Sequence, residues 1–211
     1  MAKRIGLKRT QALLENLKRE LAMGGTTFSA ANIQGAASGT YGDGAVSGST
    51  TAPVTRITQQ NGEVITTITL DLTNLSSSGE NGKIVGNKEA AADSVAPAYL
   101  MQWNTNTHGI CYKVEMACVE IPAGNGTFLD FNLETDDAAL EMGGDPSTNN
   151  VTILDAGGNF AAGTTKQNLV VGALANNQYI YVVNGAAPGA TGDAQYTAGQ
   201  FVIKFHGHKT F

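Results

Sequence analysis

The sequence predicts a mainly β protein, an antiparallel β-sandwich of jelly-roll type with an N-terminal amphipathic helix on an extended arm. Three features favour this fold class: short runs of alternating apolar and polar residues, Asn-Gly pairs between several of these runs, and a basic, leucine-striped stretch ahead of them. A chain of 211 residues suits one principal β domain with an appendage. We therefore divide it into an arm (1–25), a connector (26–53) and a β-sandwich domain (54–211).

The arm carries a basic amphipathic helix. Residues 7–22 place leucines on one stripe and charged residues elsewhere, and Gly24 and Gly25 provide a stop. A helix of this length is marginal on its own in water, so the stripe packs either on the chain's own domain or on a partner. The residues that we expect to bind a partner are Lys3, Arg4, Leu7, Lys8, Arg9, Leu14, Leu17, Lys18, Arg19 and Leu21.

The connector is dominated by Gly, Ala, Ser and Thr, which is typical of a flexible or extended tether. A helix on such a tether can reach away from its own domain. The same composition also suits an ordered segment laid across a neighbouring subunit. Both alternatives make the connector part of an arm.

The β domain shows period-two alternation in several segments. The clearest are 64–72, 110–118, 129–133 and 201–206, and shorter candidates are 54–58, 83–86, 98–103, 151–154, 168–174 and 178–183. Asn-Gly pairs at 61–62, 81–82, 125–126 and 184–185 suit tight hairpins and therefore antiparallel strands. One internal helix is expected over 136–142, where acidic residues occupy the first turn and two glycines follow the last.

Charge is scarce and unevenly divided. Only 15% of residues are charged, against about 25% in ordinary soluble domains. Residues 1–22 hold six basic and two acidic side chains, a balance of +4, and the rest holds seven basic and sixteen acidic ones, a balance of −9. The arm therefore suits an acidic surface, either protein or nucleic acid, while the acidic body would repel phosphates and disfavours nucleic acid as a partner.

The sequence predicts a protein that is neither exported nor inserted in a membrane. No apolar run approaches the ~18 residues of a membrane span, and the N-terminus lacks the apolar core of a signal peptide. Cys111 and Cys118 lie seven apart in one expected strand, so we expect their side chains on opposite faces, unable to bridge. Free thiols fit a reducing cytosol.

Reactive groups do not converge in the sequence. His206 and His208 share a strand face but lack a third ligand, and the acidic stretch 134–145 lacks the spacing of a calcium loop. Tyr99, Trp103 and Tyr112 would line a sugar site only if they met on one surface, and packing in the core or between subunits is the favoured use. Nucleophile, nucleotide and zinc-protease motifs are absent, so we predict a non-enzyme without catalytic residues, metal or cofactor.

The opening KRIGLKRTQALLENLKREL, the small-residue connector, the β-rich body and the closing GQFVIKFHGHKTF resemble virion structural proteins of tailed phages that infect marine bacteria, particularly cyanophages. This resemblance implies a capsid decoration or cement protein, made in the host cytoplasm and located in the virion. Its partner would be the major capsid protein or another virion protein. The alternative is a tail or fibre component that binds a host receptor or a carbohydrate.

Low charge also predicts self-association, since part of the outside lacks solvating groups, although Gly- and Thr-rich loops can form a neutral surface without a partner. We expect a homo-oligomer. The jelly-roll fold and the resemblance together give a trimer as the expected state. The possible subunit contacts are Tyr99, Met101, Trp103 and Phe201.

Overall fold

The computed structural model describes residues 11, 41–45, 53–78, 80–87, 96–124, 129–148, 150–169, 174–185 and 194–209. The ten predicted arm contacts lie outside these residues, as does the predicted helix over 7–22 apart from Gln11. Within the described ranges, no helix has the length and apolar character needed to span a membrane.

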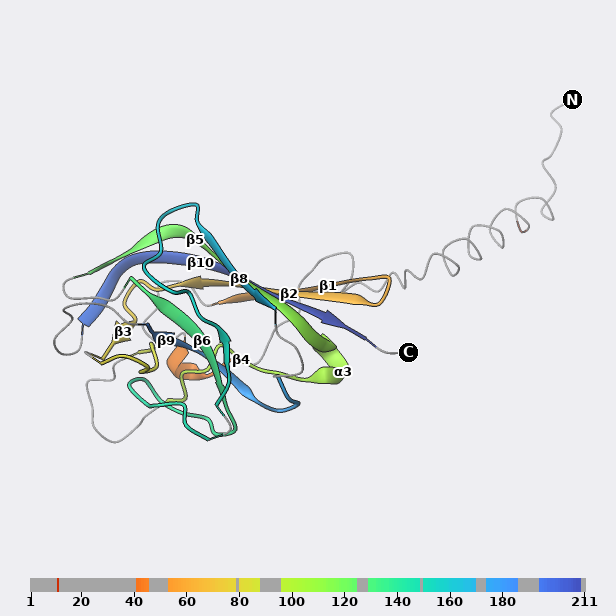
Figure 1. Ribbon diagram of the computed structural model, residues 1–211, viewed down its shortest axis with the longest axis horizontal. Helices are drawn as coiled ribbons and strands as arrows, with labels where there is room; N and C mark the ends of the chain where they lie inside the picture. Colours follow the sequence, from red (N-terminus) through yellow and green to blue (C-terminus); the bar gives the residue numbers. More distant parts are fainter. Residues whose placement is uncertain are drawn as a thin grey trace, which may run out of the picture.

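The described part of the chain is mainly β, as predicted, and forms two antiparallel sheets that lie one above the other (Figure 1). The larger sheet has the order β1 (Val54–Gln60), β2 (Glu63–Asp71), β10 (Ala194–His208), β5 (Ile110–Gly124) and β8 (Thr165–Leu169), and β3 (Ser76–Ser77) also pairs with β10. The smaller sheet has the order β4 (Met101–Gln102), β9 (Tyr179–Asn184), β6 (Phe131–Asp136) and β7 (Thr152–Leu154). Apart from Gln11, the helical elements among the described residues are the 3₁₀ turn η1 (Asp43–Ala45) and the one-turn α3 (Thr105–His108).

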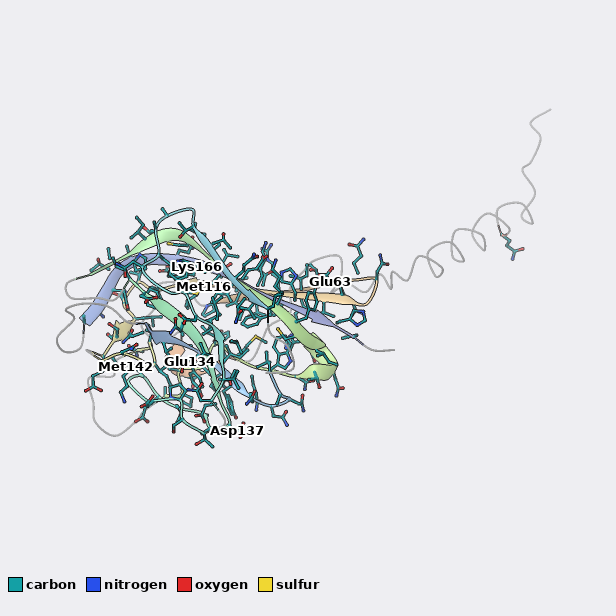
Figure 2. All side chains as sticks on the ribbon, in the orientation of Figure 1. Glu63, Met116, Glu134, Asp137, Met142 and Lys166 are labelled. Atoms are coloured by element: carbon teal, nitrogen blue, oxygen red, sulfur yellow. The ribbon has the colours of Figure 1, made fainter. Side chains whose placement is uncertain are left out.

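The main core lies between the two sheets. Alternate residues of β2, β5, β10, β6 and β9 point inward, and Met116 of β5, labelled in Figure 2, is fully covered there. Phe201 of β10 lies edge-on to Phe131 and Phe160, with ring centroids 5.4 and 5.0 Å apart. Burying each such side chain contributes roughly 1.5–3 kcal/mol, so the core that joins the sheets dominates the stability of the domain.

A second, smaller cluster covers the outer face of the smaller sheet. Tyr181 and Val183 of β9 alternate with inward-facing neighbours and point away from the main core. They pack against Ile84, Ala98 and Leu140 from the flanking segments. The smaller sheet is therefore buried on both faces at β9, whereas the strands of the larger sheet carry half-buried or exposed residues on their outer side.

Of the predicted Asn-Gly turns, 61–62 closes a hairpin. Asn61 and Gly62 have φ values of 51° and 82°, and the flanking Gln60 and Glu63 pair directly. These positive φ values are what a two-residue hairpin turn requires. The pair at 184–185 does not close a hairpin; Asn184 ends β9, and its side-chain amide donates to the carbonyls of Ser78 and Glu80.

The predicted helix over 136–142 is wrong. Strand β6 runs through Asp136, and irregular backbone follows. The Tyr181 hydroxyl donates to the carbonyl of Ala138 (2.5 Å) and accepts from the backbone N–H of Leu140 (2.9 Å). Because a buried tyrosine uses the backbone groups that a helix would pair internally, tertiary contacts override the local helix signal.

The prediction that the two cysteines point to opposite faces is also wrong. Strand β5 contains a bulge: His206 pairs with Lys113, but the next residue of β10 pairs with Cys111, which leaves Tyr112 as an extra residue. The bulge returns Cys111 to the core side, so Cys111 and Cys118 are both buried, and both are free thiols. A strict period of two would place Tyr112 on the core face with Val114, but Tyr112 is exposed.

Candidate functional site

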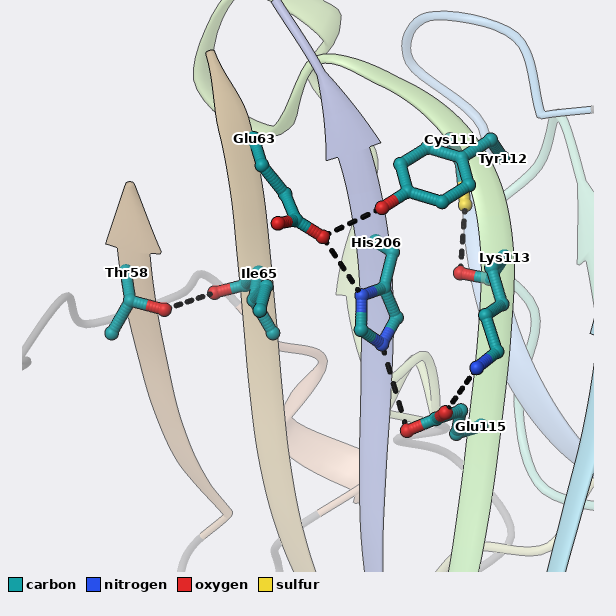
Figure 3. Close-up of polar contacts among 8 residues, drawn as sticks. All are labelled: Thr58, Glu63, Ile65, Cys111, Tyr112, Lys113, Glu115 and His206. Atoms are coloured by element: carbon teal, nitrogen blue, oxygen red, sulfur yellow. Dashed lines mark hydrogen bonds and ion pairs between the residues drawn. The ribbon is translucent and has the colours of Figure 1, made fainter. Parts of the chain in front are cut away.

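Five polar side chains form a connected network across three strands on the outer side of the larger sheet, and we call it the polar network (Figure 3). Its members are Glu63 of β2, His206 of β10, and Tyr112, Lys113 and Glu115 of β5. The register places His206 opposite Lys113 on β5, and the bulge turns Tyr112 outward. Strand pairing thus brings together residues that are far apart in the sequence.

His206 lies between two carboxylates at the centre of the polar network. Its Nδ1 is 3.4 Å from Glu63 Oε1, and its Nε2 is 3.5 Å from Glu115 Oε2. Tyr112 donates its hydroxyl to the same Glu63 oxygen at 2.6 Å, and the Lys113 ammonium donates to Glu115. A neutral imidazole can donate to only one of these carboxylates, whereas an imidazolium can donate to both.

The electrostatics of the polar network favour charged carboxylates. The hydrogen bond from Tyr112 is the main cause that lowers the pKa of Glu63, and His206 adds to it. The Glu63 carboxylate in turn raises the pKa of Tyr112 to about 12. Donation from Lys113 lowers the pKa of Glu115. At neutral pH both carboxylates are therefore ionised, and their lowered pKa makes them weaker bases than ordinary carboxylates, while Tyr112 keeps its proton.

The two carboxylates that lie beside His206 were not predicted from the sequence. Glu63 and Glu115 reach the ring from the two neighbouring strands, which requires a register that the sequence does not reveal. The period-two placement of acidic residues on expected strands was the available signal. Among the described residues, no three His, Cys, Asp or Glu side chains gather closely enough to hold a metal ion.

Three of the four predicted subunit contacts lie in the core of the chain itself. Met101, Trp103 and Phe201 are at most 1% exposed in a single chain, so its own core already covers them, which corrects their assignment as contacts. Tyr99 is half-buried, and its ring lies tilted against that of Tyr179, with ring centroids 4.7 Å apart. With Trp103 in the core and Tyr112 on the outer side of the larger sheet, the three aromatic residues considered for a sugar site do not converge.

A second polar contact, between His108 and Thr66, is buried at the end of α3. Asn104 caps this turn by accepting from the backbone N–H groups of Asn106 and Thr107. His108, at its end, contacts the buried Thr66 hydroxyl through Nδ1 at 2.8 Å and stacks on Trp103. Burial, helped by the nearby Lys209 charge, lowers the pKa of His108 to about 4. This imidazole is therefore neutral at physiological pH and has a structural role.

Comparisons with protein-family models, with curated proteins and with solved structures give no match to this chain.

Proposed function

We propose that this protein is a non-enzymatic virion structural protein, a decoration or cement protein that binds a phage capsid through its N-terminal arm. The observation that carries the proposal is the distribution of exposed apolar surface. Among the described residues, all six exposed large apolar side chains lie on strands of the larger sheet: Val54, Ile110, Tyr112, Val119, Ile121 and Leu169. Exposed apolar side chains collected on one sheet favour a protein contact.

The charge division of the chain supports the role of the arm. A +4 arm ahead of a −9 remainder suits attachment to an acidic protein surface while the β domain contacts its neighbours.

The strand order supports a jelly roll. Apart from β1 and β3, the larger sheet has the order β2-β10-β5-β8 and the smaller one β4-β9-β6-β7. Two four-stranded antiparallel sheets linked in this way correspond to two Greek keys, and jelly rolls are common in viral capsid and lectin domains. Such domains often assemble around symmetry axes, which supports a homo-oligomer, with a trimer as the proposed state.

Removal of residues 1–25 tests the arm. The truncated protein should keep the circular dichroism spectrum and melting temperature of the full chain but fail to bind particles that lack it. A full-length variant with Lys83→Gln, a body residue outside the strands of the larger sheet, controls for lost positive charge and should bind normally. Binding by the truncated protein at full-length affinity would exclude attachment through the arm.

Electron cryomicroscopy of purified particles tests the capsid assignment. We expect density for the β domain at regular positions on the head. Density confined to the tail would favour the alternative, a tail or fibre component that binds a host receptor or carbohydrate. That alternative lost one support when Tyr99, Trp103 and Tyr112 proved not to share a surface.

A further inference from the structure

A pocket of about 440 Å³ lies at the end of the sandwich, where α3 meets the ends of β5 and β10. Its lining residues are Thr105, Asn106, Gly109, Ile110, His208 and Lys209. Gly109 has a φ of 78°, and a Cβ there would lie 2.8 Å from the backbone carbonyl of His208. A glycine is therefore needed for α3 to turn directly into β5 against the end of β10.

The lining of the pocket contains two basic residues and no acidic one. Lys209 is half-buried, and its ammonium contacts the neutral side-chain oxygen of Gln59 at 3.5 Å. Within the described ranges, no carboxylate lies within ion-pair distance of Lys209. Lys209, a half-buried cation that has no counter-ion among the described residues, gives its side of the pocket a positive potential. Glu63 of β2, which pairs with His208 and is not part of the lining, interacts electrostatically with the imidazole.

Hydrogen-bond donors in the pocket divide into engaged and available groups. The backbone N–H and hydroxyl of Thr105 both donate to the Asn176 side chain, and the backbone N–H of Asn106 donates to Asn104. The Lys209 ammonium, the His208 ring and the Asn106 side-chain amide remain as donors that a ligand can meet. Ile110, which is 53% exposed, adds an apolar surface.

We propose that this pocket binds a small organic oxyanion, with its carboxylate or phosphate group against Lys209 and His208 and its uncharged part against Ile110. A volume of about 440 Å³ exceeds that of a bare phosphate and lies within the roughly 300–1,000 Å³ range of small-molecule sites. Charge-assisted hydrogen bonds to lysine suit either oxyanion. This binding site is independent of the role of the arm in assembly.

Amide chemical shifts of the ¹⁵N-labelled full chain test the proposal, with benzoate, phenyl phosphate and the neutral benzamide as probes. Benzoate or phenyl phosphate should shift the amides of Gly109, His208 and Lys209 in a saturable manner, and benzamide should not. Saturation by only one of the two oxyanions would identify carboxylate or phosphate as the preferred group. Absence of saturable shifts with both, or equal binding of benzamide, would overturn the proposal.

Substitution of the pocket lysine provides the second arm of the experiment. Lys209→Gln should weaken oxyanion binding about tenfold or more, and Lys209→Arg should retain it because the charge is kept. Lys204→Gln is the matched control, since Lys204 lies on β10, which ends one residue before Lys209, is exposed and is outside the pocket. Unchanged binding by a Lys209→Gln variant with a native-like spectrum would contradict the assignment.

Discussion

The outer faces of the two sheets differ in how far the chain's own residues cover them. On the smaller sheet, Tyr181 and Val183 are covered by a second apolar cluster from flanking segments. The larger sheet instead presents the polar network and all the exposed large apolar side chains of the described residues. Negative charge is concentrated on the side of the smaller sheet. Residues 129–158, which include β6 and β7, hold seven acidic residues and no basic one.

From this difference we propose separate roles for the two sheets. A face covered by its own chain contributes stability, whereas a face with exposed apolar residues and little net charge suits contact with another protein. Figure 2 shows Glu134 and Asp137 on the side of the smaller sheet and Glu63 at the hairpin end of the larger one. The two faces should therefore respond differently to the same substitution.

The largest expected effect comes from a charge placed on the covered face. Val183 is completely buried on the outer side of the smaller sheet, so Val183→Asp would bury a carboxylate among apolar residues. We expect a loss of about 4 kcal/mol or more in the free energy of unfolding. Urea titration followed by circular dichroism measures this loss.

Val202→Asp is the matched variant on the larger sheet. Val202 is half-buried on the outer side of β10, where the new carboxylate stays in contact with water. Its cost should stay within about 1 kcal/mol. Similar losses in the two variants would contradict the distinction between a covered and an open face.

A smaller effect is expected from His108, which lies on the inner side of the larger sheet. The pKa of His108 is about 4 in the folded state and near 6.5 when unfolded, so the unfolded chain takes up this proton first as the pH falls. Its contribution is complete above pH 6.5 and is lost as the pH falls toward 4, about 3 kcal/mol in all.

Urea unfolding of the native chain and of His108→Asn at several pH values checks this. The difference between their pH profiles isolates His108 from the carboxylates that titrate in both proteins. The native chain should lose stability more steeply than the variant between pH 6.5 and 4. Parallel profiles would show that His108 does not titrate differently in the two states.

Local sequence signals predicted β2, β9 and the hairpin turn at Asn61-Gly62, which depend mainly on residues adjacent in the sequence. The alternation over 64–72 matches β2, and Asn61-Gly62 forms the expected hairpin, because side-chain period and turn chemistry depend on adjacent residues. The segment 178–183 likewise matches β9 to within one residue.

Features that depend on tertiary pairing could not be predicted. The bulge at Tyr112 changes which face of β5 Cys111 occupies, and a strict period of two cannot represent one extra residue. Tyr181 holds the segment expected as a helix in an irregular conformation from a distance of about forty residues. The contacts of His206 with Glu63 and Glu115 likewise exist only once the register is known.

Removal of the Tyr112 hydroxyl should have a modest effect, confined to the polar network. Tyr112→Phe deletes the main cause of the lowered pKa of Glu63, so this pKa should rise toward 4.5. Stability should change by less than about 1 kcal/mol, since the pair is exposed. This contribution is present above pH 4.5 and is lost as the pH falls through the folded pKa of Glu63.

Carboxyl chemical shifts of Glu63 across a pH titration measure this change. Tyr99→Phe serves as the control, because Tyr99 belongs to the cluster on the smaller sheet and should leave the pKa of Glu63 unaltered. An unchanged Glu63 pKa in Tyr112→Phe would assign the lowering to His206 instead.

The smallest effect on stability should come with the clearest effect on assembly. Leu169 is 70% exposed on the edge strand β8, so Leu169→Glu should change the free energy of unfolding by no more than about 0.5 kcal/mol. If the larger sheet mediates the proposed self-association, a charge there should dissociate the oligomer, because an unpaired carboxylate is costly to bury in an interface. Light scattering at micromolar concentration should report the trimer mass for the native chain and the monomer mass for Leu169→Glu.

Thr152→Glu, on an exposed position of the smaller sheet, is the matched control and should leave the native mass unchanged. A native chain that is itself a stable monomer would contradict self-association in solution, and an oligomer that dissociates with Thr152→Glu but not with Leu169→Glu would place the contact on the opposite sheet.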